Sequence, residues 1–275
     1  MASKNRQIIP YVVGSACCPP EFLGCGVKWS GLIGGNKNIA VVGGGGKTGL
    51  IEALEAELQA QGRPALVTVT TRLGRWQLPH LARVEAESLA EAQSAAGRAA
   101  GGERLLLAGP CEPDNLRLEK VSGLPLGWFA ELRPAAADEL VFLIEADGSA
   151  GLPLKAHREN EPLIPQLGCF TIAVLGLSVL TRPWRGAVHR PEILAAAIGP
   201  PEGDGPLAPE QVAAFIGRDW AAFKPDLIFL NQADVLESQA QRQAGQKLFH
   251  LLAAGGWKVA AGSLKDKRLI HFVSE

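Results

Sequence analysis

Short apolar runs alternate along this chain with longer segments whose apolar positions recur with the period of an α-helix. The apolar runs predict strands buried on both faces, and they span residues 39–42, 65–70, 104–108, 141–144, 171–175, 227–230 and 257–260. The helical patterns span residues 47–61, 85–100, 191–198, 208–216 and 238–253. Strands that alternate with helices are typical of a mostly parallel sheet.

This order predicts an α/β protein, a three-layer fold with a mostly parallel sheet, in which ligands bind at the carboxyl ends of the strands. Residues 1–38 are rich in Gly, Pro and Cys, with one short helix expected near residues 21–32, and we interpret them as an N-terminal extension. We expect residues 39–275 to form a single α/β domain. The stretch 199–206, rich in Gly and Pro, is the clearest interruption within it.

Composition narrows the function classes. The chain has 275 residues and a formal net charge of −1, so it offers no electrostatic basis for binding nucleic acid or an anionic membrane. No apolar run approaches the roughly 18–20 residues that span a bilayer. Lys4 and Arg6 precede a short apolar stretch as in an export signal, but Pro10 interrupts it, and a cytoplasmic protein is expected.

The cysteines do not form a recognisable framework. Their odd number argues against a set of disulfides, and their spacing matches no standard zinc site. They are Cys17, Cys18, Cys25, Cys111 and Cys169. We expect them to be small apolar residues, with a soft metal or sulfur chemistry at the first three as the alternative.

A glycine run after the first predicted strand carries the clearest chemistry. The run consists of Gly43, Gly44, Gly45 and Gly46, and it is followed by Lys47 and Thr48 at the start of a predicted helix. Glycines let the backbone turn tightly and present amides to an anion, and the helix dipole favours negative charge at the same point. Lys47 can then reach phosphates, and the Thr48 hydroxyl can bind Mg²⁺. The usual motif has a glycine where this chain has Val41, and a plain flexible loop is the alternative.

Acidic and basic side chains follow neighbouring strands. Glu145 and Asp147 leave the buried run 141–144, and Asp147 is the preferred partner for Mg²⁺, with Glu145 second. Residues 68–72 end the second strand, where a threonine can approach the metal and Arg72 can offset charge during phosphoryl transfer. A solvated Asp-Gly-Ser turn and ordinary strand threonines are the alternatives.

A predicted base pocket follows the strand 227–230. Asn231 and Asp234 resemble the Asn-Lys-x-Asp element that binds guanine, in which a carboxylate accepts two hydrogen bonds from the base. Gln232 replaces the lysine, and Ser263 lies in a loop similar to the companion base-contacting loop. These residues favour guanine over adenine modestly, because short Asn-x-x-Asp sequences also occur by chance.

Three basic residues have no place in a minimal nucleoside triphosphatase. They are Lys155, His189 and Arg190, and they are candidates for binding a substrate or partner, since guanidinium groups suit phosphate or carboxylate and histidine can move protons. A surface loop with solvated charges is the alternative.

In this order the segments resemble the YqeC family, described as accessory proteins of selenium-dependent molybdenum hydroxylases. The matching stretches are residues 41–48, 68–72, 145–155, 188–192, 231–234 and 262–264. The family's phosphate loop also lacks the first glycine, so Val41 is expected there. Gly49 and Gln232 depart from the family pattern, and Gln232 leaves the identity of the base open.

The resemblance implies a P-loop nucleoside triphosphatase that binds Mg²⁺ with GTP or ATP and assists the maturation of a molybdenum hydroxylase or its cofactor. Catalytic roles would fall to Lys47, Asp147 and Arg72, with purine nucleotide held by the glycine loop and by Asn231 and Asp234. One alternative is a phosphotransferase acting on a small molecule held by His189 and Arg190. Another is a binding protein that docks a partner without hydrolysis.

Overall fold

The computed structural model describes residues 28–113 and 119–270. Its main sheet has nine strands, and all the neighbouring pairs are parallel except the last one, β13 with β14. In spatial order the strands are β14 (Arg268–Ile270), β13 (Val259–Ser263), β12 (Leu227–Asn231), β10 (Phe170–Gly176), β1 (Asn38–Gly43), β8 (Val141–Glu145), β2 (Ala65–Val69), β5 (Leu105–Ala108) and β4 (Ala82–Glu85). The predicted α/β class with a mostly parallel sheet is confirmed.

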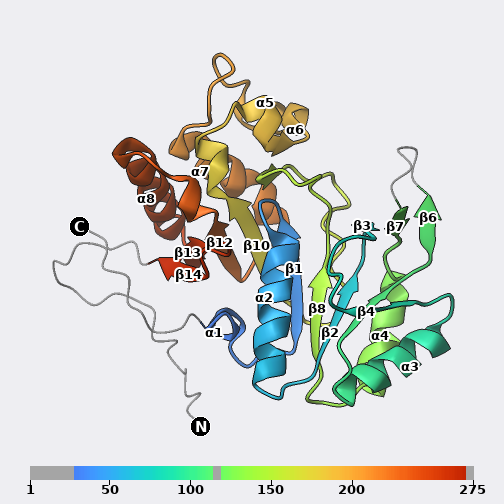
Figure 1. Cartoon of the computed structure of the whole chain (residues 1–275). Helices are drawn as coiled ribbons and strands as arrows, with labels where there is room; N and C mark the ends of the chain where they lie inside the picture. The colour runs from blue at the N-terminus through green and yellow to red at the C-terminus, as the bar shows by residue number, and fades with distance from the viewer. Residues whose placement is uncertain (1–27, 114–118, 271–275) are drawn as a thin grey trace, which may run out of the picture.

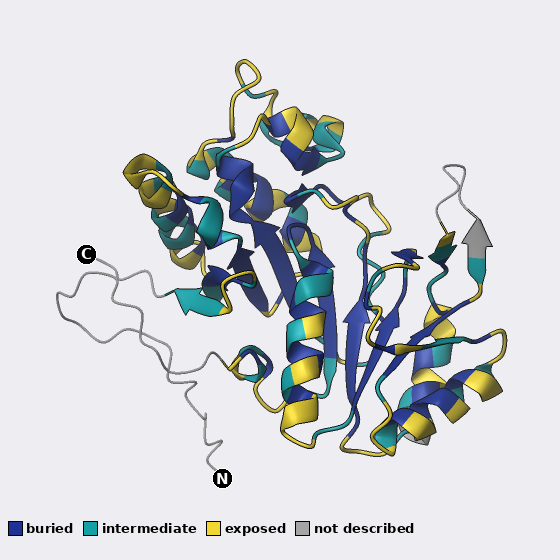
Figure 2. Ribbon diagram, in the orientation of Figure 1, coloured by how far each residue is buried: buried dark blue, intermediate teal, exposed yellow. Residues whose placement is uncertain are grey.

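Helices cover both faces of this sheet (Figure 1). The helices of the described chain are α1 (Ser30–Ile33), α2 (Lys47–Ala60), α3 (Leu89–Ala100), α4 (Leu126–Ala135), α5 (Trp184–Ala187), α6 (Pro191–Ile198), α7 (Pro209–Asp219) and α8 (Gln239–Ala254). Alternate residues of β1 point to opposite faces. Val41 packs with α1 and α2 on one face, and Ala40 and Val42 pack in the core shared by α3, α4, α7 and α8. The fold therefore has three layers, with a buried sheet between helices whose outer sides are exposed (Figure 2).

The predicted extension joins the core at its described end. Trp29 and Ile33 are buried beside α2, and the Trp29 ring meets Phe229 edge-on at 5.9 Å between centroids. The Ser30 hydroxyl donates a hydrogen bond of 2.6 Å to Glu57. Cys17, Cys18 and Cys25, with most of the helix expected near residues 21–32, lie outside the described residues.

Two expected boundaries are corrected by the structure. The helix expected from residue 85 begins at Leu89, because Glu85 ends β4 and Ser88 caps the helix by accepting a hydrogen bond from the Glu91 amide. The strand expected at residues 257–260 lies instead at Val259–Ser263 and places Ser263 at its end.

Two small sheets accompany the main one. Strands β9 (Leu154–Lys155) and β11 (Val188–His189) pair in parallel, with His189 opposite Lys155. Strands β3 (Leu73–Gly74), β7 (Glu119–Val121) and β6 (Cys111–Pro113) form an antiparallel sheet after β2. Short 3₁₀ turns, η1 (Leu177–Leu180), η2 (Trp220–Ala222) and η3 (Ala233–Val235), follow β10, α7 and β12. Figure 1 shows α5 and α6 beyond the end of the sheet at which β1 stops and α2 begins.

Candidate functional site

The glycine loop joins β1 to α2 in a conformation that only glycine can adopt. Gly43, Gly45 and Gly46 have φ of 92°, 79° and 128°, in the left-handed region that other residues avoid. A Cβ on Gly45 would lie 2.3 Å from the backbone nitrogen of Gly176, and one on Gly44 would lie 2.5 Å from the Leu152 carbonyl oxygen. The run therefore lets the chain pass close to its neighbours while it turns.

Neighbouring segments hold the loop through its own amides. The Gly43 N–H donates to Asp147 at 2.8 Å, the Gly44 N–H to the Val174 carbonyl at 2.8 Å and the Gly45 N–H to the Leu152 carbonyl at 2.9 Å. The first amides of α2 follow directly, and such amides have no acceptor within their own helix. An anion at this point would therefore find its donors at the start of α2.

Lys47, in the first turn of α2, points back into the loop and is 4% exposed. Its Nζ donates to the Gly43 carbonyl at 2.8 Å and to the Ser149 hydroxyl at 3.1 Å, and it lies 3.2 Å from Asp147 Oδ1. Glu145 Oε1 is farther away, at 3.9 Å. In this structure the loop carbonyl and two residues of the Glu-Ala-Asp-Gly-Ser segment satisfy the ammonium group.

Thr48 and Glu145 bring two oxygens together beside the loop. The Thr48 hydroxyl donates to Glu145 Oε2 at 2.8 Å and accepts from Gln77 Nε2 at 3.0 Å. Burial raises the pKa of the Glu145 carboxyl, although Lys47 and the Thr48 hydrogen bond oppose that rise. A hydroxyl and a carboxylate are the hard oxygen ligands that Mg²⁺ prefers, so these side chains fit a cation that is also bound by phosphate.

Asp147 is completely buried beneath the loop. Its Oδ2 accepts from the Gly43 amide, lies 3.0 Å from His157 Nε2 and 3.4 Å from Lys155 Nζ. Burial raises the pKa of Asp147, but Lys47, His157 and Lys155 lower it by more, and the net pKa lies well below the usual range. The carboxylate is therefore charged, and it is held by the Gly43 amide and by the side chains of Lys47, His157 and Lys155.

The network continues from Asp147 to α7. His157 Nδ1 lies 2.6 Å from Asp219 Oδ2, so its ring bridges two carboxylates. Burial lowers the pKa of His157, but the hydrogen bonds with Asp147 and Asp219 raise it by more, and the net shift is upward. A protonated ring can donate to both carboxylates at once.

The predicted substrate residues Lys155 and Arg190 are engaged in ion pairs. Lys155 is completely buried, with its Nζ 3.4 Å from Asp147 and 3.2 Å from Glu161. Arg190 binds Glu161 through both terminal nitrogens and also donates to the Ala156 carbonyl at 3.0 Å. In this conformation both cations serve the protein interior, and their role toward a substrate stays a prediction.

The third predicted substrate residue, His189, lies beside these cations and is half-buried. Burial lowers the pKa of its imidazole, and the neighbouring charges of Arg190 and Lys155 lower it further.

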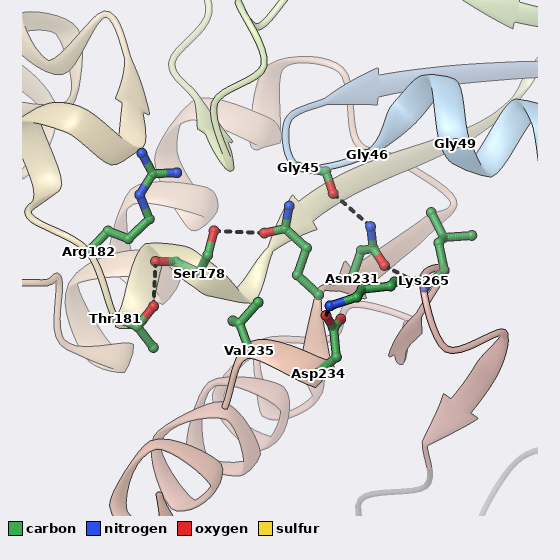
Figure 3. Close-up of a pocket in the computed structure, with 12 residues that line it drawn as sticks. Gly45, Gly46, Gly49, Ser178, Thr181, Arg182, Asn231, Asp234, Val235 and Lys265 are labelled. Carbon is green, nitrogen blue, oxygen red and sulfur yellow. Dashed lines mark hydrogen bonds and ion pairs between the residues drawn. The ribbon is translucent and has the colours of Figure 1, made fainter. Parts of the chain in front are cut away.

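A cleft of about 530 Å³ lies beside the glycine loop, at the ends of β10 and β12 (Figure 3). Its walls come from the loop, from the segments after β10 and β12, and from the turn after β13. They include Gly45, Gly46, Gly49, Ser178, Thr181, Arg182, Asn231, Gln232, Asp234, Val235, Leu264 and Lys265. Figure 3 shows Arg182 on one side of the cleft, and Asn231, Asp234 and Lys265 grouped together on the other.

The predicted base residues meet at one end of this cleft. Asp234 Oδ1 accepts from the Ser263 hydroxyl at 2.7 Å, and Asp234 Oδ2 lies 3.8 Å from Lys265 Nζ. Asn231 lies between the two halves of the site, since its Nδ2 donates to the Gly45 carbonyl at 2.7 Å and its Oδ1 accepts from the Leu264 amide at 3.0 Å. Asn231 thus joins the base end of the cleft to the phosphate loop.

Gln232 occupies the position at which the guanine-binding element has lysine. It has a φ of 65°, and its Oε1 accepts from the Ser178 hydroxyl at 2.7 Å. The side chain also closes on the backbone after β10, since a Cβ on Gly176 would lie 2.3 Å from Gln232 Oε1. Gln232 therefore joins the segments after β12 and β10 along one wall of the cleft.

The structure also places the predicted site residues at the end of β2. The buried hydroxyls of Thr68 and Thr70 make no hydrogen bond within the described chain, and Arg72 is exposed. Sequence reasoning missed Gln77, which contacts Thr48 directly, because a single glutamine in an irregular segment has no distinguishing pattern. It also gave no role to Asp219, which comes from a helix distant in sequence and meets His157 through the fold.

Within residues 28–113 and 119–270, no group of three or more His, Cys, Asp or Glu side chains could hold a metal ion, and no helix is both long and apolar enough to cross a membrane. Cys111 and Cys169 are free thiols, and burial raises the pKa of Cys169 to about 11.

A glycine loop between a buried strand and a helix, with Lys-Thr at the helix start and acidic residues on the adjacent strand, places this chain among α/β proteins with a P-loop-like architecture. The family model described as YqeC protein matches residues 39–192, and the chain belongs to the YqeC family. It is 35% identical over 158 residues to the protein named "Uncharacterized protein YqeC" of Escherichia coli (strain K12). That alignment covers 50% of this chain and 51% of the relative, so the chain spans about half the length of the curated relative it matches.

Proposed function

We propose that this protein binds a nucleoside triphosphate with Mg²⁺ and hydrolyses it, and that it assists the maturation of a molybdenum hydroxylase or its cofactor. The observation that carries the nucleotide proposal is the continuous cleft from the glycine loop and the start of α2 to Asp234 and Lys265. The cleft thus joins a proposed site for the phosphates, at the glycine loop, to a proposed site for the base, at Asp234. The client enzyme rests on the family resemblance alone.

In this proposal the phosphates lie at the start of α2, where the helix amides and Lys47 bind them. Lys47 leaves the Gly43 carbonyl and the Ser149 hydroxyl to do so. Asp147 keeps Lys155 and His157 as counter-charges when Lys47 turns to the phosphates. The loop can then hold its shape through the Gly43 amide while its lysine moves.

We propose that Glu145, rather than Asp147, shares the cation with Thr48. Glu145 already accepts the Thr48 hydroxyl, whereas Asp147 is committed to Gly43 and to buried cations. A bound cation would also offset the cost of burying the Glu145 charge. Mg²⁺ is usually held by one or two carboxylates together with phosphate oxygens, which is what this pair of oxygens allows.

The base end favours guanine. Guanine presents two donors, N1–H and the 2-amino group, on one edge, while adenine presents one donor beside an acceptor. A carboxylate can accept hydrogen bonds at both oxygens, and in the structure Asp234 Oδ1 accepts from the Ser263 hydroxyl while Oδ2 lies 3.8 Å from Lys265 Nζ. Val235 and Leu264 provide apolar walls for a planar ring.

Calorimetric titration with GTP, ATP and CTP, each with and without Mg²⁺, tests the site. Binding of GTP is expected to be tighter than that of ATP or CTP and to be lost in Lys47→Ala, while the exposed Lys258→Ala serves as a matched control. Asp234→Asn is expected to weaken the binding of GTP while leaving the affinity for ATP nearly unchanged. Equal GTP affinity in Lys47→Ala and the parent would reject the phosphate site, and tighter ATP than GTP binding would reject the base assignment.

The fate of the γ-phosphate then separates the reactions that such a site can support. Free phosphate and GDP formed from GTP without an added acceptor support hydrolysis. Nucleotide binding with no GDP formed supports a binding protein, and GDP formation that requires a small-molecule acceptor, with the γ-phosphoryl group recovered on that acceptor and not as free phosphate, supports a phosphotransferase. Lys47→Ala is expected to abolish the effect in each case, so it tests the site and not the class of reaction.

A further inference from the structure

A glutamine from outside the predicted site contacts the hydroxyl that the proposed cation needs. Gln77 follows β3, and its Nε2 donates to Thr48 Oγ1 at 3.0 Å. The same hydroxyl donates its single proton to Glu145 at 2.8 Å, so toward Gln77 it acts as the acceptor. The other end of the amide is fixed, because Gln77 Oε1 accepts from the Gly74 amide at 2.9 Å.

This contact is unfavourable for a cation at the same oxygen. The amide directs the positive end of its N–H dipole at Thr48 Oγ1, and Mg²⁺ needs that oxygen at about 2.0–2.1 Å. An N–H group and a divalent cation that face one oxygen repel each other. The hydrogen bond from Gln77 to Thr48 is therefore disfavoured when the cation is bound and retained when the cation is absent.

The segment around Gln77 can transmit such a change to the surface. The preceding residue, Trp76, is 61% exposed, and its ring lies against Gly74, where a Cβ would be 2.6 Å from the ring atom Cη2. The following residue, Leu78, is buried with a φ of 57°. Gln77 thus lies between an exposed ring and a buried side chain, and its Oε1 contacts Gly74, the residue against which that ring lies.

We propose that Gln77 is a positioning residue that senses the Mg²⁺–nucleotide. In the free protein it covers the Thr48 hydroxyl, and when the cation is bound it releases that hydroxyl and displaces Trp76. The inference rests on the proposed function, because it requires a nucleotide and a cation at Thr48. It adds a link between the occupied site and a surface tryptophan next to β3.

Tryptophan fluorescence measures the proposed movement directly. Titration of the full chain with GTP is expected to change the emission only when Mg²⁺ is present, and the change is expected to vanish in Trp76→Phe. In Gln77→Ala the Mg²⁺-dependent change is expected to be lost, because no amide remains to be released from Thr48. Gln59→Ala, an exposed glutamine on α2, is the matched control and is expected to behave as the parent.

Affinity gives a second, independent readout. Removing one ordinary hydrogen bond that competes with the cation is expected to tighten Mg²⁺–GTP binding by about 2- to 12-fold and to leave Mg²⁺-free binding unchanged. Gln77→Glu keeps an acceptor for the Gly74 amide, removes the donor to Thr48 and adds a negative charge beside the proposed cation, so it is expected to tighten Mg²⁺–GTP binding by more than Gln77→Ala does. Thermal melting of each variant confirms that it is folded.

The outcomes separate this inference from the function on which it rests. No GTP binding by calorimetry would overturn both. Intact Mg²⁺-dependent binding with an unchanged Trp76 signal would overturn the inference alone. Weaker binding in Gln77→Ala by the same factor with and without Mg²⁺ would also overturn it, because Gln77 would then only support the fold.

Discussion

Replacing Asp147 by asparagine tests whether this carboxylate is the buried counter-ion of Lys47, Lys155 and His157 in the free protein. Asparagine keeps the shape of the side chain, and its carbonyl oxygen can still accept from the Gly43 amide. The charge is lost, however, and Lys47, Lys155 and His157 all lie within 3.4 Å of the altered group. The change therefore leaves buried positive charge without its partner.

Breaking a buried ion pair from one side costs about 3–5 kcal/mol. For a domain of this size each kcal/mol lowers the melting temperature by about 2–4 °C, so Asp147→Asn is expected to melt about 6–20 °C below the parent. Circular dichroism on nucleotide-free protein measures this shift, and urea unfolding gives the free energy. A residue that served only as a ligand for Mg²⁺ would show no such loss without the metal.

Two further variants sharpen the result. Adding Lys155→Met to Asp147→Asn removes one of the cations that Asp147 balances, while Glu161 keeps Arg190 as its partner, and is expected to recover part of the stability, with a coupling of about 0.5–3 kcal/mol between the two sites. Asp204→Asn breaks an exposed pair with Arg185 and is expected to change stability by less than about 1 kcal/mol. If Asp147→Asn also lies within about 1 kcal/mol of the parent, the argument for a buried counter-ion is wrong.

Three other predictions follow from the same geometry. Gly45→Ala places a Cβ against backbone atoms at a φ of 79° and is expected to abolish nucleotide binding. Gly49→Ala meets only ordinary contacts, at 3.6 Å, within α2, and it is expected to preserve the fold and raise stability by about 0.5–1 kcal/mol. Calorimetry compares nucleotide binding by the two variants, and thermal melting compares their stability. Asn231→Ala removes two hydrogen bonds and is expected to cost about 1–3 kcal/mol in urea unfolding, and no measurable loss would contradict its bridging role. Burial raises the pKa of Glu161, but Arg190 and nearby donors lower it to about 2, from an ordinary value of 4.5. The stability it contributes is thus present above about pH 4.5 and lost as the pH falls toward 2, and melting of Glu161→Gln is expected to show a smaller acid-induced decline than the parent over that window.

The main sheet was predictable because buried parallel strands are continuous apolar runs, and residues 141–144 and 227–230 show this directly. Strands β9 and β11 were not, since two residues cannot display a period. The start of α3 was misplaced because Glu85 belongs equally well to an Ala- and Glu-rich helix by composition. Its place at the end of β4 depends on pairing with β5, which the local sequence does not encode.

Some contacts of the candidate site could likewise be predicted from the sequence, and others could not. The glycine loop, Thr48 and Glu145 follow from strand ends and local motifs, and the structure brings them together. The contact with Gln77 depends on the path of an irregular segment after β2, and the bridge from His157 to Asp219 depends on how α7 packs. Neither pair shares a local pattern, so only the folded chain reveals them.

The family match covers the residues proposed to bind phosphate but not those proposed to bind the base. The match covers residues 39–192, which contain the glycine loop, Glu145 and the ion pairs of Arg190. Through Lys155 and Asp147 those ion pairs are connected to the Gly43 amide of the glycine loop. Asp234 and the rest of the base end lie beyond the match. The family match therefore contains the residues to which the proposal assigns phosphate binding, while the identity of the base depends on residues outside the match, and discrimination between GTP and ATP is the measurement that addresses it.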